Sequence, residues 1–140
     1  MKNGLILVIA LFLLFSCDKN DTNNGNPYLP NTSFSIQINT NLPTYSNLQF
    51  PSNAVKINQA NVGIRGIIVF NTGTGFRAFD GACPNQVVAT CSTLTLSGIN
   101  ATCPCDSAVY SLFTAQSPGK QYPLKEYRTE SNGTIITISN

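Results

Sequence analysis

The sequence predicts an all-β fold for most of the chain, and two observations lead to this prediction. Short segments rich in β-branched and aromatic residues recur between turn signals made of Gly, Pro and Asn, as is typical of strands. After the first 16 residues, no window has apolar residues at the helical period. The expected strands are 34–38, 54–57, 64–70, 76–79, 94–96, 109–113, 122–127 and 134–138.

Local patterns support individual strands and turns. Residues 33–38 alternate polar with apolar side chains, as a strand with one solvated face requires. The pair Asn132-Gly133 lies between two strand-like runs and predicts a tight hairpin turn. The stretch 71–75 also joins two apolar runs. We interpret it as a hairpin loop, because a phosphate-binding loop would need a helix after it and none follows.

The first residues have the pattern of an export signal. Lys2 precedes an apolar run of 11 residues, 5–15, and Ser16 and Cys17 follow it. Signal-peptide cores contain about 7 to 15 apolar residues, whereas a membrane-spanning helix needs about 20. We therefore expect residues 1–16 to be a cleaved signal peptide.

The stretch Leu14-Phe15-Ser16-Cys17 resembles the lipobox of bacterial lipoproteins. The resemblance implies cleavage just before Cys17 and lipidation of its thiol, with acyl chains such as palmitate anchoring the chain to a membrane. It also implies a place in the bacterial cell envelope, at the outer membrane or the periplasmic face. The alternative is an ordinary secretory signal followed by a spare cysteine, which would leave an unpaired thiol in an oxidising compartment.

A polar, breaker-rich segment follows the signal. Residues 17–32 have almost no apolar side chain to bury, so we expect a flexible tether before a single β domain at 33–140. The start of this segment, 17–21, also resembles the surface-export signals of some Bacteroidetes lipoproteins. A simple solubilising role explains its Asp and Asn residues equally well.

The charge balance argues against a nucleic-acid partner. The chain has 8 basic and 6 acidic residues, and removal of Lys2 with the signal leaves 8 − 1 = 7 basic ones. These charges are scattered along the sequence, whereas nucleic-acid binding usually needs a basic patch or stripe.

Four cysteines remain after Cys17, and three of them lie in two loop motifs. The first motif is Cys83-Pro84-Asn85 and the second is Cys103-Pro104-Cys105-Asp106, with 17 residues, 86–102, between Asn85 and Cys103. This arrangement resembles the two cluster-binding loops of Rieske proteins, C-x-H and C-x-x-H, at the family's separation. The flanking segments 67–80 and 118–135 resemble the hairpin before the first loop and the strand-turn-strand that closes the domain. The resemblance implies a small antiparallel β-sandwich or barrel with two cysteine-bearing loops.

The family's cofactor is a [2Fe-2S] cluster, held by two cysteines on one iron and two histidines on the other. This chain has no histidine, and Asn85 and Asp106 stand at the matching positions. An amide oxygen is a weak ligand for iron and a carboxylate is a hard anionic one, so a true Rieske cluster is excluded. We therefore expect no bound cofactor. If an altered cluster did bind, the resemblance implies Cys83 and Cys103 as ligands and Asp106 as a further one.

The resemblance also implies two disulfides. In respiratory Rieske proteins the cysteine between the ligands of the second loop pairs with one after the first loop, which implies Cys91–Cys105 here. Cys91 lies eight residues after Cys83, further along than in the family, so the first loop must be longer. Cys83 and Cys103 correspond to the two thiolates on one iron and, without that iron, would come within bonding range of each other. Their pairing would give the second disulfide.

Three functions remain open from the sequence. The favoured one is an envelope lipoprotein whose degenerate, cluster-free Rieske-like domain is a disulfide-braced binding or structural module. The alternative is an electron carrier of the Rieske ferredoxin family with an atypical [2Fe-2S] cluster and an unknown redox partner. A thiol-disulfide device using Cys103 and Cys105 has the least support, because no helix N-terminus would stabilise a thiolate there.

The remaining polar and aromatic residues suggest structural roles. Asp80 precedes Gly81 and Asp106 precedes Ser107, as turn and capping residues do. Tyr110, Phe113 and Tyr122 are expected in the core or at its rim. With no histidine and no Ser or Cys paired with a base, the sequence predicts no enzyme activity.

Overall fold

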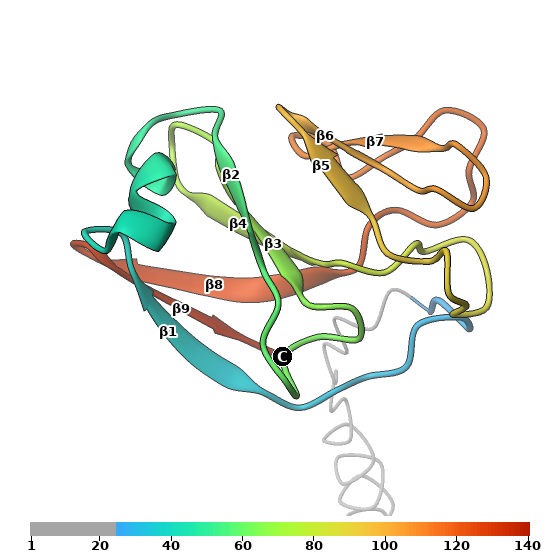
Figure 1. The fold of residues 1–140 in the computed structure, drawn as a ribbon, viewed down its shortest axis with the longest axis horizontal. Coiled ribbons are helices and arrows are strands. Elements are labelled where there is room, and N and C mark those ends of the chain that lie inside the picture. The colour runs from blue at the N-terminus through green and yellow to red at the C-terminus, as the bar shows by residue number, and fades with distance from the viewer. Residues whose placement is uncertain (1–24) are drawn as a thin grey trace, which may run out of the picture.

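A computed structural model describes residues 25–140 (Figure 1). The expected signal peptide, Cys17 and the first part of the expected tether lie outside these residues. Nearly all regular structure in the described part is strand, which confirms the all-β prediction. The elements are β1 (Ser35–Asn39), η2 (Pro43–Gln49), β2 (Ala54–Ile57), β3 (Ile67–Asn71), β4 (Phe76–Asp80), β5 (Thr95–Ser97), β6 (Asn100–Thr102), β7 (Val109–Ser111), β8 (Glu126–Asn132) and β9 (Ile135–Ser139).

The strands form two antiparallel sheets. The larger one has six strands in the order β1-β9-β8-β4-β3-β2, and the smaller one has three in the order β5-β6-β7. In Figure 1 the small sheet, drawn in orange, stands apart from the large one and continues into the loops on the right. We call residues 81–125 the small-sheet half and the six-stranded sheet with η2 the large-sheet half.

Two apolar clusters fill the interior. One packs the side chains of β1, β9 and η2 against one face of β3 and β4, and includes Leu48 and Ile136. The other packs the opposite face of β3 and β4 against the small-sheet half, and includes Phe70, Phe79 and Tyr110. The central hairpin β3–β4 is therefore buried on both sides, as its run of four fully buried residues, 67–70, requires.

Both predicted hairpins are confirmed. β8 and β9 pair up to Asn132 and Ile135, and Gly133 between them has φ +59°, a conformation that glycine adopts without strain. β3 and β4 pair up to Asn71 and Phe76 around the 71–75 loop.

Two expected strands begin three or four residues later than the sequence pattern suggests, whereas the others begin within one residue of it. β3 starts at Ile67 rather than Ile64, because the N–H groups of Ile64 and Arg65 donate to the Asp80 carboxylate instead of a strand. β8 starts at Glu126 rather than Tyr122. There the backbone of Tyr122 is hydrogen-bonded to a side chain of the first cysteine loop, and Pro123 has no N–H to donate.

Two elements have no clear sequence signal. β6 is three polar or small residues that become a strand by pairing with β5 on one side and β7 on the other. The short 3-10 helix η2 begins at Pro43 and is held by Leu48, whose side chain is fully buried. Within residues 25–140, no helix is long and apolar enough to cross a membrane.

The end of the expected tether packs against the domain. We call residues 26–31 the N-terminal strap. Its Leu29 is 2% exposed, and Tyr28 packs edge-to-face on Tyr122 with ring centroids 5.9 Å apart. Asn31 accepts a hydrogen bond from the buried Lys125 at 2.7 Å. The packed part of the chain thus begins before the expected domain boundary at residue 33.

Candidate functional site

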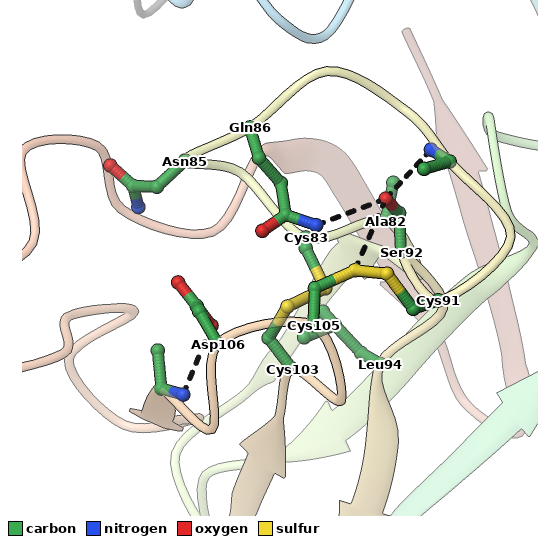
Figure 2. Close-up of a disulfide and its surroundings, with 12 residues drawn as sticks. Ala82, Cys83, Asn85, Gln86, Cys91, Ser92, Leu94, Cys103, Cys105 and Asp106 are labelled. Carbon is green, nitrogen blue, oxygen red and sulfur yellow. Dashed lines mark hydrogen bonds between the residues drawn. A yellow bond between two sulfur atoms is a disulfide. The ribbon is translucent and has the colours of Figure 1, made fainter.

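The cysteines lie on two neighbouring loops at one end of the small sheet (Figure 2). Loop 1, residues 81–94, joins β4 to β5 and closes on itself through backbone hydrogen bonds from Cys83 to Ser92 and from Leu94 to Gly81. Loop 2, residues 103–108, joins β6 to β7 and closes through the bond from Cys103 N–H to the Ala108 carbonyl at 2.8 Å. A third loop, residues 112–125, runs beside both and joins β7 to β8.

Two disulfides connect loop 1 to loop 2. Cys83 is bonded to Cys103 with the Cα atoms 5.6 Å apart, and Cys91 is bonded to Cys105 with the Cα atoms 5.1 Å apart. These are the pairs that the resemblance implied. The two bonds differ in depth, since Cys83 and Cys103 are at most 1% exposed whereas Cys91 lies on the surface. We call them the inner and the outer disulfide.

Asn85, at the first lost histidine position, connects loop 1 to the third loop. Its Nδ2 donates to the Tyr122 carbonyl at 2.7 Å and to the Tyr110 hydroxyl at 2.8 Å. Its Oδ1 accepts from the Tyr122 N–H at 2.9 Å. Both ends of the amide are occupied, and Figure 2 shows the side chain well away from the sulfur atoms. Burial raises the pKa of Tyr110, so its hydroxyl stays protonated.

Asp106, at the second lost histidine position, also makes contacts within the loops. Its Oδ1 accepts from the Ala108 N–H at 3.1 Å, as a turn-capping residue does, and its Oδ2 forms an ion pair with Lys120 Nζ at 2.6 Å. The hydrogen bond from Lys120 holds the pKa of Asp106 below its ordinary value, and the same bond raises the pKa of Lys120.

These residues do not fit a Rieske cluster. Two thiolates and two imidazoles are needed, and the corresponding positions hold two cysteines bonded to each other, an amide engaged at both ends and a carboxylate paired with Lys120. Among residues 25–140, the possible metal ligands that lie close together are three sulfurs: the Sγ atoms of Cys83, Cys103 and Cys105 lie within 4.8 Å of one another.

Asp80, the last residue of β4, forms hydrogen bonds at the start of loop 1. Its side chain is fully buried and accepts hydrogen bonds from the N–H groups of Ile64 and Ala82 and from the Tyr127 hydroxyl, at 2.6, 2.7 and 2.6 Å. Burial, with the neighbouring Asp80 carboxylate, raises the pKa of Tyr127. The sequence predicted a turn residue here. The wider network joins segments far apart in the chain and had no sequence signal.

Ser92 was also missed by the sequence analysis. It is fully buried, its Oγ lies 3.7 Å from Cys105 Sγ, and it accepts hydrogen bonds from Gln86 Nε2 at 3.2 Å and from the Ala89 N–H at 2.8 Å. The one sequence signal for Ser92 was its position directly after Cys91, which places it near the disulfides.

Two antiparallel sheets, with two cysteine loops at one end of the smaller, define a Rieske-like β fold, and solved structures with that fold resemble this chain. A chain from the complex of reduced oxygenase and oxidized ferredoxin in carbazole 1,9a-dioxygenase gives a TM-score of 0.50 at 19% identity, covering 75% of this chain and 92% of that chain. A quaternary ammonium Rieske monooxygenase in complex with an inhibitor gives 0.51 at 15% identity, covering 84% of this chain.

This chain spans only 33% of that monooxygenase. The ferredoxin of carbazole 1,9a-dioxygenase from Nocardioides aromaticivorans gives a TM-score of 0.47 at 14% identity, covering 77% of this chain and 97% of that chain. No protein-family model matches the sequence, and comparison with curated proteins finds no match. At 19% and 15% identity, the likeness to the two structures with TM-scores of 0.50 and 0.51 supports the fold alone.

Proposed function

We propose that this protein is an envelope lipoprotein whose Rieske-like domain is a cluster-free, disulfide-braced binding or structural module. The proposal rests on the contacts made by the two residues at the positions of the family's histidine ligands. Asn85 connects loop 1 to the third loop and Asp106 connects loop 2 to it, so both residues contribute to loop packing. The two disulfides join the same loops covalently.

A binding role is supported by exposed apolar side chains in the small-sheet half. Among residues 25–140, seven large hydrophobic side chains are exposed, and four of them belong to this half. Val87, on loop 1, is 72% exposed. Val87 and Val109 lie on or next to the disulfide-joined loops, where exposed apolar side chains can contact a protein partner. The four residues are Val87, Ile99, Val109 and Phe113.

The anchor is proposed from the sequence. Lipidation of Cys17 would attach the domain to an envelope membrane, with the segment after it as a spacer. Mass spectrometry of the N-terminal peptide of the mature protein tests this, and we expect a diacylglycerol thioether on Cys17. A Cys17→Ala variant should instead stay unprocessed, and a mature protein with an unmodified Cys17 would contradict the anchor.

The choice between module and electron carrier rests on one experiment. The full chain is purified anaerobically, treated by iron-sulfur reconstitution, and measured by visible absorption, EPR and iron content. We expect no stoichiometric iron, and we expect Cys83, Cys91, Cys103 and Cys105 to resist alkylation until a reductant is added. A two-iron signal that is lost in Cys83→Ser would overturn the cluster-free proposal in favour of an atypical [2Fe-2S] carrier.

A further inference from the structure

The two disulfides lie next to each other in the structure. Cys105 belongs to the outer disulfide, yet its Sγ lies within 4.8 Å of the Sγ atoms of both Cys83 and Cys103, which form the inner one. Figure 2 shows the two sulfur pairs side by side. A thiolate formed at Cys105 would therefore sit next to an intact disulfide, and attack of a thiolate on a disulfide sulfur is the elementary step of thiol-disulfide exchange.

The two bonds differ in their access to solvent. Cys91 is exposed and Cys105 is partly buried, so a reductant in solution can reach the outer bond. Cys83 is 1% exposed and Cys103 is fully buried, so the same reductant cannot reach the inner bond without opening the loops. The inner bond therefore has Cys105 as its nearest potential nucleophile.

Ser92 can assist a thiolate at Cys105. Its Oγ already accepts hydrogen bonds from Gln86 Nε2 and from the Ala89 N–H, so these donors occupy its lone pairs. Its own proton is left with two acceptors, the Val87 carbonyl at 3.4 Å and Cys105 Sγ at 3.7 Å. A negative charge on Cys105 would make the sulfur the better acceptor, and hydrogen bonding to the charged form favours that form.

We propose that the two disulfides form an exchange relay, in which reduction of Cys91–Cys105 by an external dithiol opens the buried Cys83–Cys103 bond through Cys105. In the first step the dithiol gives two electrons and two protons to Cys91 and Cys105 and becomes a disulfide. In the second, the Cys105 thiolate attacks Cys83 Sγ, the Cys83–Cys105 bond forms, the Cys83–Cys103 bond breaks, and Cys103 leaves as a thiolate.

The second step only rearranges bonds. The proton lost by Cys105 is balanced by the one that Cys103 takes up, and no electrons enter or leave. A second dithiol then reduces Cys83–Cys105, which leaves four thiols. Two equivalents of a dithiol thus break both disulfides in a fixed order, the outer one first. The dithiol can be a small molecule or an exported thiol protein.

The relay needs two disulfides and no cluster, so it rests on the function proposed above. It differs from a device based on Cys103 and Cys105 alone, because the acceptor is the inner disulfide on the other loop.

A matched pair of variants tests the relay. Cys91→Ser and Cys105→Ser each remove the outer disulfide, but only Cys91→Ser keeps the Cys105 thiol beside the inner bond. Dithiothreitol is the probe, and reduction of Cys83–Cys103 is followed by quenching, alkylation and peptide mass spectrometry. We expect Cys105→Ser to lose the inner bond roughly tenfold or more slowly than Cys91→Ser. Equal rates in the two variants would overturn the relay.

Ser92→Ala tests the relay with both disulfides in place. We expect the inner bond to open several-fold more slowly, timed from the point at which the outer bond has been reduced, because the Cys105 thiolate loses a hydrogen-bond donor. In the wild type, the inner bond should open after the outer one, and inner reduction that precedes outer reduction would contradict the proposal. Stoichiometric iron in the purified chain would instead overturn the proposed function itself, whereas two disulfides with equal variant rates would overturn the relay alone.

Discussion

The large-sheet half and the small-sheet half differ in what stabilises them. Four strands of the large sheet have five residues and β8 has seven, and they surround a cluster of aliphatic side chains with only one tyrosine among its buried members. The three strands of the small sheet have three residues each. Strands so short do not hold a sheet by themselves, and both disulfides and the Asn85 and Asp106 contacts lie here.

The difference shows where the chain relies on cross-links between loops. In the large-sheet half, strand pairing and apolar burial stabilise the fold. In the small-sheet half, loops 1 and 2 project beyond the strands, and their positions depend on covalent and polar contacts between segments distant in sequence. A change to those contacts should affect this half first, and four predictions test that statement.

The largest effect should come from removing both disulfides. The bonds span 20 and 14 residues, and each should stabilise the fold by about 3 kcal/mol through loop entropy. We expect a variant with Cys83, Cys91, Cys103 and Cys105 all changed to Ala to lose most hydrogen-exchange protection in the small-sheet half while the large sheet keeps its own. Urea unfolding measures the accompanying decrease in the free energy of unfolding. Equal loss of protection in both halves would show that they are not separable.

The second effect concerns Asp80, which lies where the two halves meet. Asp80→Asn removes the charge from a buried acceptor of several hydrogen bonds, and bonds to a charged group contribute about 1.5 to 3 kcal/mol. We expect a loss of that order in the free energy of unfolding, with weaker protection in both halves. Glu130→Gln, on the exposed face of β8, is the control and should leave stability unchanged.

A smaller and more local effect should follow from Asn85→Ala. The variant loses the hydrogen bonds to the Tyr122 backbone and to Tyr110, at a cost of about 1 to 3 kcal/mol. We expect faster hydrogen exchange in the third loop and no change in β9. Gln116→Ala, an exposed residue of the same loop, is the matched control. Unchanged exchange at Tyr122 would contradict the bridging role of Asn85.

The smallest effect should be a pH dependence at loop 2. The folded-state pKa of Asp106 lies below its ordinary value of 3.8 because of Lys120. The ion pair therefore stabilises loop 2 above about pH 4, and this contribution is lost as pH falls through the lowered pKa. Hydrogen exchange at Ala108 should rise over that interval. Lys120→Met should remove most of the pH dependence, and an identical pH profile in that variant would exclude the ion pair as its cause.

How far the sequence predicts the structure depends on the range of the interactions. The strand 54–57 was predicted with its observed bounds, because its signal lies in its own residues and in the breakers beside it. The cysteine pairs followed from resemblance to a known arrangement of loops. The local turn contact of Asp80 with the Ala82 N–H was predicted, but its bond to the Ile64 N–H and the role of Asn85 were not, because these contacts involve backbone groups 16 or more residues away.

The N-terminal strap has a consequence for how the domain would meet a membrane. Asn26 Nδ2 donates to the carbonyl of Pro84, next to Cys83, so the first residue of the strap lies against loop 1. With Cys17 as the proposed anchor, eight residues, 18–25, lie between it and Asn26, a reach of at most about 30 Å. The proposed anchor would then keep the cysteine loops within about that distance of the membrane, where a partner or reductant must reach them.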